Sequence, residues 1–124
     1  MSLMKGKKGL IMGVANERSI AWGISQKLSE AGAELAFTYL GEALKKRVIP
    51  LAKSLNSDFT LSCNVENKDE IIKLFEDIRT KWGQIDFIVH AVAFSDKSEL
   101  SGEYLNTTRE NFLKSMLISC FSFT

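Results

Sequence analysis

Two apolar periodicities alternate along this 124-residue chain, and the alternation constrains its fold more than any other feature. Four short runs are rich in β-branched and aromatic residues: GLIMG (9–13), AELAFTY (33–39), DFTLSCNV (58–65) and IDFIVHAVAF (85–94). Such runs are typical of buried parallel strands. Between them, apolar residues recur every three or four positions, as on one face of a helix. We therefore expect an α/β fold in the order β-α-β-α-β-α-β-α, with a parallel sheet and right-handed crossovers.

Each helical segment carries one apolar stripe that is expected to face the sheet. The stripes are Ile20, Ile24, Leu28 and Ala31; Leu44, Val48, Leu51 and Leu55; and Ile71, Leu74, Phe75 and Ile78. Gly32 and Gly83 follow the first and third stripes, where a left-handed residue commonly ends a helix. Pro50 removes a backbone donor, so the second helix is expected to kink or end early. Capping boxes are predicted to begin the third and fourth helices at Asn67 with Glu70 and at Thr107 with Glu110.

This alternation predicts where a ligand binds. In a doubly wound sheet with strand order 3-2-1-4, a crevice opens between the first and fourth strands, outside their carboxyl ends. Those ends are the stretches after Met12 and after His90. We therefore expect the candidate site in the two loops that follow these residues.

Composition excludes several other classes of function. A formal net charge of +1 gives no electrostatic reason to expect nucleic acid or a membrane surface as a partner. The lysines near the start precede no long apolar run, so we expect no secretory signal and a cytoplasmic location. Cys63 and Cys120 have no paired spacing, which predicts two buried thiols and no metal site.

The first of the two loops, within GLIMGVANERSIAWGI (9–24), has the elements of a phosphate-binding turn. Gly13 allows a sharp turn, and Ala15 is small enough for close backbone approach to a ligand. Ser19 and Ile20 open the first helix, whose free N–H groups and dipole favour a pyrophosphate. Gly23 is expected to let that helix pack closely on the sheet. The same residues also fit a plain βα connection with a serine N-cap, and spacing alone does not separate the two interpretations.

A resemblance to a known family extends over essentially the whole chain. Five stretches carry it, in a fixed order: GVANERSIAWGI, GAELAFTY, CNV, HAVAF and TRENF. The chain resembles the bacterial enoyl-acyl-carrier-protein reductases of type II fatty acid synthesis, a divergent branch of the short-chain dehydrogenases/reductases. The resemblance implies a Rossmann-type, doubly wound parallel sheet, represented here by its first four βα units in the order 3-2-1-4. Residues 1–124 would then be the N-terminal part of a single dinucleotide-binding domain, cut off in the fourth helix.

The resemblance also implies an NADH site. Gly13, Ser19 and Ile20 would hold the pyrophosphate, in agreement with the physical interpretation of the turn. Leu40 falls where the family meets the adenosine ribose, commonly with a glutamine, and Leu40 cannot make that side-chain hydrogen bond. The remaining residues would contact the adenine (Asn64 and Val65), run alongside the cofactor (Ala91, Val92 and Ala93) and begin the substrate-side loop (Phe94 and Ser95).

Two further considerations bear on the cofactor and the chemistry. NADH is favoured over NADPH, because the basic cluster Lys45, Lys46 and Arg47 lies a helical turn or more beyond the second strand. In the family, hydride from NADH reaches the β-carbon of a trans-2-enoyl thioester on acyl carrier protein, and a tyrosine with a nearby lysine completes the reaction. We expect both residues beyond Thr124 and no catalytic residue within this chain. His90 is expected to be a core histidine, and Tyr104 to belong to a surface loop.

Other interpretations remain open at this point. The fourth strand would have an unpaired edge, which predicts that the chain is part of a longer reductase. The resemblance implies that the complete enzyme is a homotetramer. The alternatives are a non-catalytic dinucleotide-binding module and a carbonyl-reducing short-chain dehydrogenase. The absence of a TGxxxGxG loop disfavours the last of these.

Overall fold

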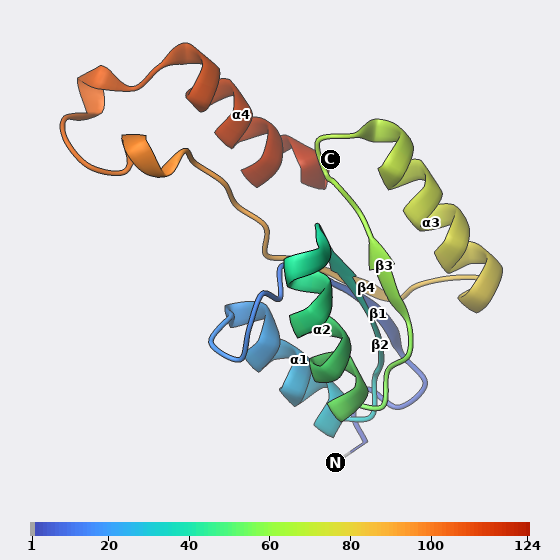
Figure 1. Ribbon diagram of the computed structural model, residues 1–124. Coiled ribbons are helices and arrows are strands. Elements are labelled where there is room, and N and C mark those ends of the chain that lie inside the picture. The colour runs from blue at the N-terminus through green and yellow to red at the C-terminus, as the bar shows by residue number, and fades with distance from the viewer. Residues whose placement is uncertain (1) are drawn as a thin grey trace. The chain divides into compact units, whose positions relative to one another are not determined.

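The computed structural model describes residues 2–124, which contain a four-stranded parallel sheet whose strands alternate with helices (Figure 1). The strands are β1 (Lys8–Met12), β2 (Glu34–Tyr39), β3 (Thr60–Ser62) and β4 (Phe87–His90). Their order across the sheet is β3-β2-β1-β4. The α/β class and the predicted order 3-2-1-4 are therefore confirmed.

The helices fill the predicted intervals between and after the strands. They are α1 (Ile20–Glu30), α2 (Glu42–Ser54), α3 (Lys68–Trp82) and α4 (Arg109–Ser119), with 3-10 turns at Lys97–Glu99, Tyr104–Asn106 and Phe121–Phe123. The prediction that α4 continues to Thr124 was wrong, because the helix ends at Ser119. By its internal contacts the chain divides into a first unit, Met1–Ala91, and a second unit, Val92–Thr124. The prediction of a single domain over residues 1–124 stays a prediction.

The helices of the first unit lie on both faces of its sheet. Successive right-handed crossovers place α1 and α2 on one face, because both step from β1 toward β3. The connection through α3 steps back to β4, which places α3 on the other face (Figure 1). This reversal of direction occurs between β1 and β4, where a ligand site is predicted.

The main core lies between the sheet and the two helices α1 and α2. Ile11, Phe37 and Val48 are completely buried there, and the Trp22 ring lies 6.5 Å from the Phe37 ring. The predicted stripe on α1 was wrong at Ile20 and Ile24, whereas Leu28 packs against the core as predicted. Ala21, Trp22 and Ser25 face the sheet, whereas the Ile20 side chain is 80% exposed. The indole of Trp22 offers more apolar area than either Ile20 or Ile24 alone, so the helix is oriented by the tryptophan.

Several predicted element boundaries need correction. The strands predicted over 58–65 and 85–94 are shorter in the structure, where they form β3 and β4. β3 pairs only with Phe37, Thr38 and Tyr39 of β2. Of the two effects predicted at Pro50, a kink or an early end, the early end was wrong, because α2 continues to Ser54 and buries Val48 and Ala52. Gly32 and Gly83 have φ values of 100° and 80°, as predicted for residues that end α1 and α3.

The predicted caps of α3 and α4 had different outcomes. Asn67 caps α3 as expected, because its side chain accepts from the N–H groups of Asp69 and Glu70. The cap of α4 is Thr108 rather than Thr107, and its hydroxyl accepts from Asn111 N–H at 3.1 Å. The Thr107 hydroxyl instead donates to the carbonyl of Tyr104 at 2.7 Å. The 3-10 turn that precedes α4 thus shifts the helix start by one residue.

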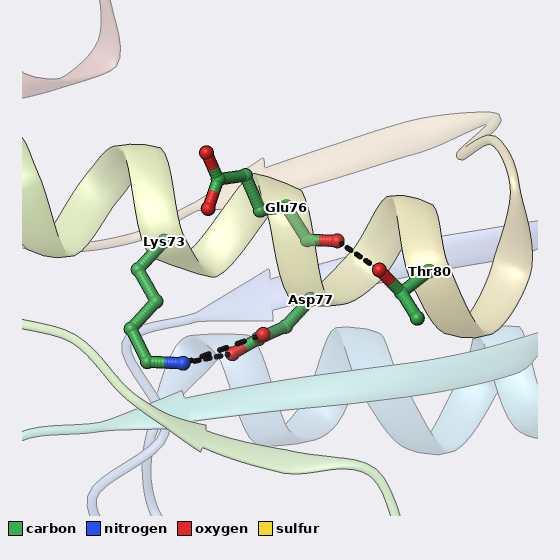
Figure 2. A network of polar contacts seen from close by, with 4 residues as sticks. All are labelled: Lys73, Glu76, Asp77 and Thr80. Atoms are coloured by element: carbon green, nitrogen blue, oxygen red, sulfur yellow. Dashed lines mark hydrogen bonds and ion pairs between the residues drawn. The ribbon is translucent and has the colours of Figure 1, made fainter.

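The polar contacts drawn in Figure 2 belong to the solvent-facing side of α3. Lys73 pairs with Asp77 at 3.2 Å, and Thr80 donates to the carbonyl of Glu76 at 3.0 Å. Because the Lys73 and Asp77 side chains are 74% and 40% exposed, this pair contributes only about 0.3 kcal/mol. The network supports the helix and is not a candidate site.

The two cysteines differ in environment, so the prediction of two buried thiols was half right. Cys63 is buried, but Cys120 is exposed at the C-terminal end of α4. Burial, with a smaller contribution from the Glu70 carboxylate, raises the pKa of Cys63 to about 11. The reactive thiolate of Cys63 therefore forms only as the pH approaches that value.

We expect this difference to be visible in thiol alkylation. Near pH 8 only about one Cys63 thiol in a thousand is ionised. Iodoacetamide should then label Cys120 in the native protein and both cysteines in denaturant, which peptide mass spectrometry can follow. Equal labelling rates of the two cysteines in the native protein would contradict the structure.

Candidate functional site

The carboxyl ends of β1 and β4 lie side by side, and the chain departs from both at the same edge of the sheet. Met12 pairs with His90, and Ala91 N–H donates to the Met12 carbonyl at 2.9 Å. Gly13 has φ +116°, and a Cβ placed on it would lie 2.1 Å from the carbonyl oxygen of Ala91. Only glycine fits this position, because both its backbone conformation and the surrounding space exclude a side chain.

The loop between β1 and α1 is organised by Ser19. This residue occupies the N-cap position of α1, as predicted, but its side chain does not cap the helix. Its Oγ instead accepts hydrogen bonds from Ala15 N–H at 2.9 Å and from Asn16 N–H at 3.2 Å. Because the Ser19 oxygen is the acceptor in both bonds, its own hydrogen remains to donate to another group. Ser19 thus shapes the loop and still offers one donor.

The first turn of α1 offers backbone donors. Trp22 and Gly23 both donate to the carbonyl of Ser19. Ile20 and Ala21 precede these two residues in the sequence, and neither of their N–H groups has an acceptor within residues 2–124. Together with the helix dipole, they form the arrangement that binds anionic groups in nucleotide-binding turns.

The predicted role of Gly23 is not supported. A Cβ on Gly23 would meet no atom within 4 Å, so this glycine does not mediate close packing in the first unit. The residues of α1 that approach the sheet are Ala21, Trp22 and Ser25, and the Ser25 hydroxyl is satisfied by the Ala21 carbonyl at 2.7 Å. The close approach at this edge of the sheet is provided by Gly13 instead.

The residues predicted to meet the nucleoside follow β2 and β3 at the same edge of the sheet. Leu40 is 52% exposed just beyond β2. Asn64 Oδ1 already accepts from Glu66 N–H at 3.0 Å, and Asn64 N–H donates to Glu70 Oε1 at the same distance. Glu70 therefore reaches back to Asn64 rather than completing a capping box with Asn67. Val65 follows and is partly buried.

The remaining predicted residues divide between the two units. Ala91 ends the first unit and lies beside Gly13, whereas Val92, Ala93, Phe94 and Ser95 begin the second. Within the second unit, Phe94 N–H donates to Ser119 Oγ at 2.9 Å, and Lys114 Nζ lies 4.6 Å from the centre of the Phe94 ring. The predicted substrate-side residues are thus held by α4.

No role was predicted from the sequence for two residues of α4, Asn111 and Ser119. Asn111 is 4% exposed and bonds to both Ser95 and Asp96, while Ser119 bonds to Phe94. The available signal was the spacing of Asn111, Ser115 and Ser119, which recur every four residues along α4. In the same unit, the hydroxyl and the N–H of Thr108 both donate hydrogen bonds to the Glu99 carboxylate. These two bonds lower the pKa of the Glu99 carboxyl.

Residues 2–124 contain no group of three or more His, Cys, Asp or Glu side chains arranged to hold a metal ion. Among the helices formed by these residues, none combines the length and the apolar character that a membrane span requires. His90, the sole histidine of the sequence, is partly buried at the end of β4 rather than in the core.

Comparison with known proteins gives consistent results. A family model described as enoyl-(acyl carrier protein) reductase matches residues 13–124. Enoyl-[acyl-carrier-protein] reductase [NADH] 2 of Rhizobium meliloti is 61% identical over 98% of this chain and 46% of its own length. The corresponding reductase of Rickettsia felis is 51% identical over 97% of this chain and 46% of its own length.

Solved structures of similar proteins have the same fold. FabI from Candidatus Liberibacter asiaticus has a TM-score of 0.97 and 56% identity, covering 99% of this chain and 48% of that one. The Anaplasma phagocytophilum reductase in complex with NAD has a TM-score of 0.94 and 54% identity, covering 98% and 46%. The chain thus spans about half the length of the relatives it matches.

Proposed function

The chain belongs to the enoyl-(acyl carrier protein) reductase family, and on that premise we propose that it supplies the NADH-binding part of a reductase. The substrate is the trans-2 double bond of an enoyl group carried on acyl carrier protein. NADH, when bound, supplies hydride to the β-carbon of the enoyl thioester. Protonation of the resulting enolate is assigned to a tyrosine and a lysine outside this chain.

The observation that carries this proposal is the edge of the sheet at β1 and β4. Gly13 leaves room where a side chain would collide with Ala91 O, and Ser19 Oγ fixes the loop that leads into α1. The N–H groups of Ile20 and Ala21 and the Ser19 hydroxyl form a donor set that fits a pyrophosphate. Ala15, at the turn of the loop, is small enough for the backbone to approach the cofactor.

The choice of NADH over NADPH is supported by the residues after β2. Leu40 has an exposed aliphatic side chain, and the first turn of α2 contains the acidic Glu42 rather than a basic residue. A 2′-phosphate usually requires an arginine at this place. Lys45, the nearest basic residue, is one turn further along α2.

The rest of the cofactor is assigned to residues that follow β3 and β4 in the chain. We place the adenine near Asn64 and Val65, and Ala91, Val92 and Ala93 alongside the nicotinamide half. Asn64 Oδ1 keeps one lone pair for the exocyclic amine after accepting from Glu66 N–H. Phe94 and Ser95 begin the surface that receives the acyl thioester. We also propose a cytoplasmic homotetramer for the complete enzyme.

Turnover of defined thioesters tests the proposal against its alternatives. The complete polypeptide that carries this sequence is incubated with NADH and either a crotonyl thioester or a 3-oxoacyl thioester, and NADH absorbance is followed. We expect NADH to be consumed with the crotonyl thioester only. Consumption with the 3-oxoacyl thioester only would indicate a carbonyl reductase. Binding of NADH without consumption in either case would indicate a non-catalytic module.

A further inference from the structure

We propose that Asn111 and Ser119 are positioning residues that fix the backbone of residues 94–96 and thereby set how the acyl thioester is held. Both lie on α4, and neither was assigned a role by the motifs of the sequence. The inference rests on the proposed function, because that function makes Phe94 and Ser95 part of the substrate surface. It concerns the second unit alone.

Asn111 forms the centre of a buried polar network. Its side chain is 4% exposed, yet every polar atom has a partner. Oδ1 accepts from Asp96 N–H at 2.8 Å, and Nδ2 donates to Ser95 Oγ at 3.1 Å. Ser115, one turn further along α4, donates to the same Oδ1 at 3.4 Å. A single amide therefore fixes one backbone group and one side chain of the substrate-side loop.

Ser119 holds the other end of the same short segment. Its hydroxyl accepts from Phe94 N–H at 2.9 Å and donates to the Phe94 carbonyl at 3.4 Å. Both backbone polar groups of Phe94 are thus occupied by one side chain. Because Phe94 and Asp96 are each tied to the helix, the peptide groups between them have little freedom to rotate.

The orientation of the Phe94 ring follows from this anchoring. With its backbone held by Ser119, the ring is presented to the ammonium group of Lys114, 4.6 Å from the ring centre. Lys114 lies between the two anchors in the sequence of α4. The helix therefore determines the position of an apolar ring, the Ser95 hydroxyl and a positive charge together. These groups suit a substrate with an apolar acyl chain beside a polar thioester.

Loss of either anchor should impair substrate binding more than cofactor binding. Each replacement, Asn111→Ala or Ser119→Ala, removes two hydrogen bonds to the loop. We expect each to raise the KM for the enoyl thioester by about tenfold, with kcat lowered less. The Kd for NADH should change less than twofold, because the phosphate-binding donors belong to the first unit. Ser119→Thr, which keeps the hydroxyl, should restore most of the wild-type KM.

Kinetics of the full-length enzyme test this inference. Asn106→Ala is the matched control, because Asn106 is an exposed asparagine in the same unit. The Tm of each variant is measured first, and if Asn111→Ala does not fold, the less buried Ser119 carries the test. An unchanged KM in folded Ser119→Ala, or equal losses in KM and in NADH affinity, would overturn the inference. An inactive wild-type enzyme would instead contradict the proposed function.

Discussion

Replacing Gly13 by alanine is expected to abolish measurable NADH binding and to destabilise the protein by about 2–5 kcal/mol. The added Cβ would lie 2.1 Å from the Ala91 carbonyl oxygen, and the residue would be held at φ +116°. Relief requires Ala91 to move, but Ala91 N–H is bonded to the Met12 carbonyl at 2.9 Å. The resulting distortion therefore falls at the junction of β1 and β4, where we place the cofactor.

Gly23→Ala is the matched control for this substitution. It adds the same atom, but in open space on α1, so the higher helix propensity of alanine should stabilise the protein by up to about 1 kcal/mol. Chemical denaturation gives the free energy of unfolding of each full-length variant, and fluorescence titration gives its NADH affinity. Equal effects of the two substitutions would show that the close approach of Gly13 to Ala91 is unimportant.

Replacing Ser19 by alanine should weaken NADH binding by about 10- to 100-fold. The change removes the acceptor for Ala15 N–H and Asn16 N–H, and it removes the hydroxyl that we assign to the pyrophosphate. The free energy of unfolding should fall by only about 1–2 kcal/mol, because the loop is partly exposed. Titration of the full-length variant with NADH measures the first effect, and denaturation measures the second.

A second serine separates the role of Ser19 from a general effect of losing a hydroxyl. Ser54, at the end of α2, donates to the Leu51 carbonyl at 2.6 Å and is exposed. Ser54→Ala should leave NADH affinity within twofold of the wild type. If Ser19→Ala binds NADH as tightly as Ser54→Ala does, the β1–α1 loop is a plain connection rather than a phosphate-binding turn.

The parallel α/β arrangement could be predicted from the sequence because it depends on periodicity and on handedness. Short apolar runs alternating with helical stripes indicate a parallel sheet with right-handed crossovers, and the strand order 3-2-1-4 is implied by the family resemblance. The predicted ligand edge then follows without knowledge of any contact. The strongest local signals were also correct, since Asn67 and Gly83 act at the ends of α3 as expected.

Details that depend on competition between neighbouring groups could not be predicted. The Ser19 side chain could either cap α1 or accept a hydrogen bond within the preceding loop. The loop conformation decides this, and Ser19 Oγ accepts from Ala15 N–H instead of capping the helix. The buried face of α1 was decided by Trp22, whose area outweighs the more regular isoleucine spacing. Gly23 matched a packing motif in position, but its surroundings are open. The role of Asn111 depends on residues 15 and 16 positions away, which local patterns do not reveal.

A crystal structure of the full-length enzyme with bound NADH would test the central claim most directly. We predict that pyrophosphate oxygens lie within hydrogen-bond distance of Ile20 N–H and of the Ser19 hydroxyl. The nicotinamide half should pass Ala91, beside Gly13. A pyrophosphate bound elsewhere, with no contact to the first turn of α1, would contradict the assignment of the cofactor site to the β1–β4 edge.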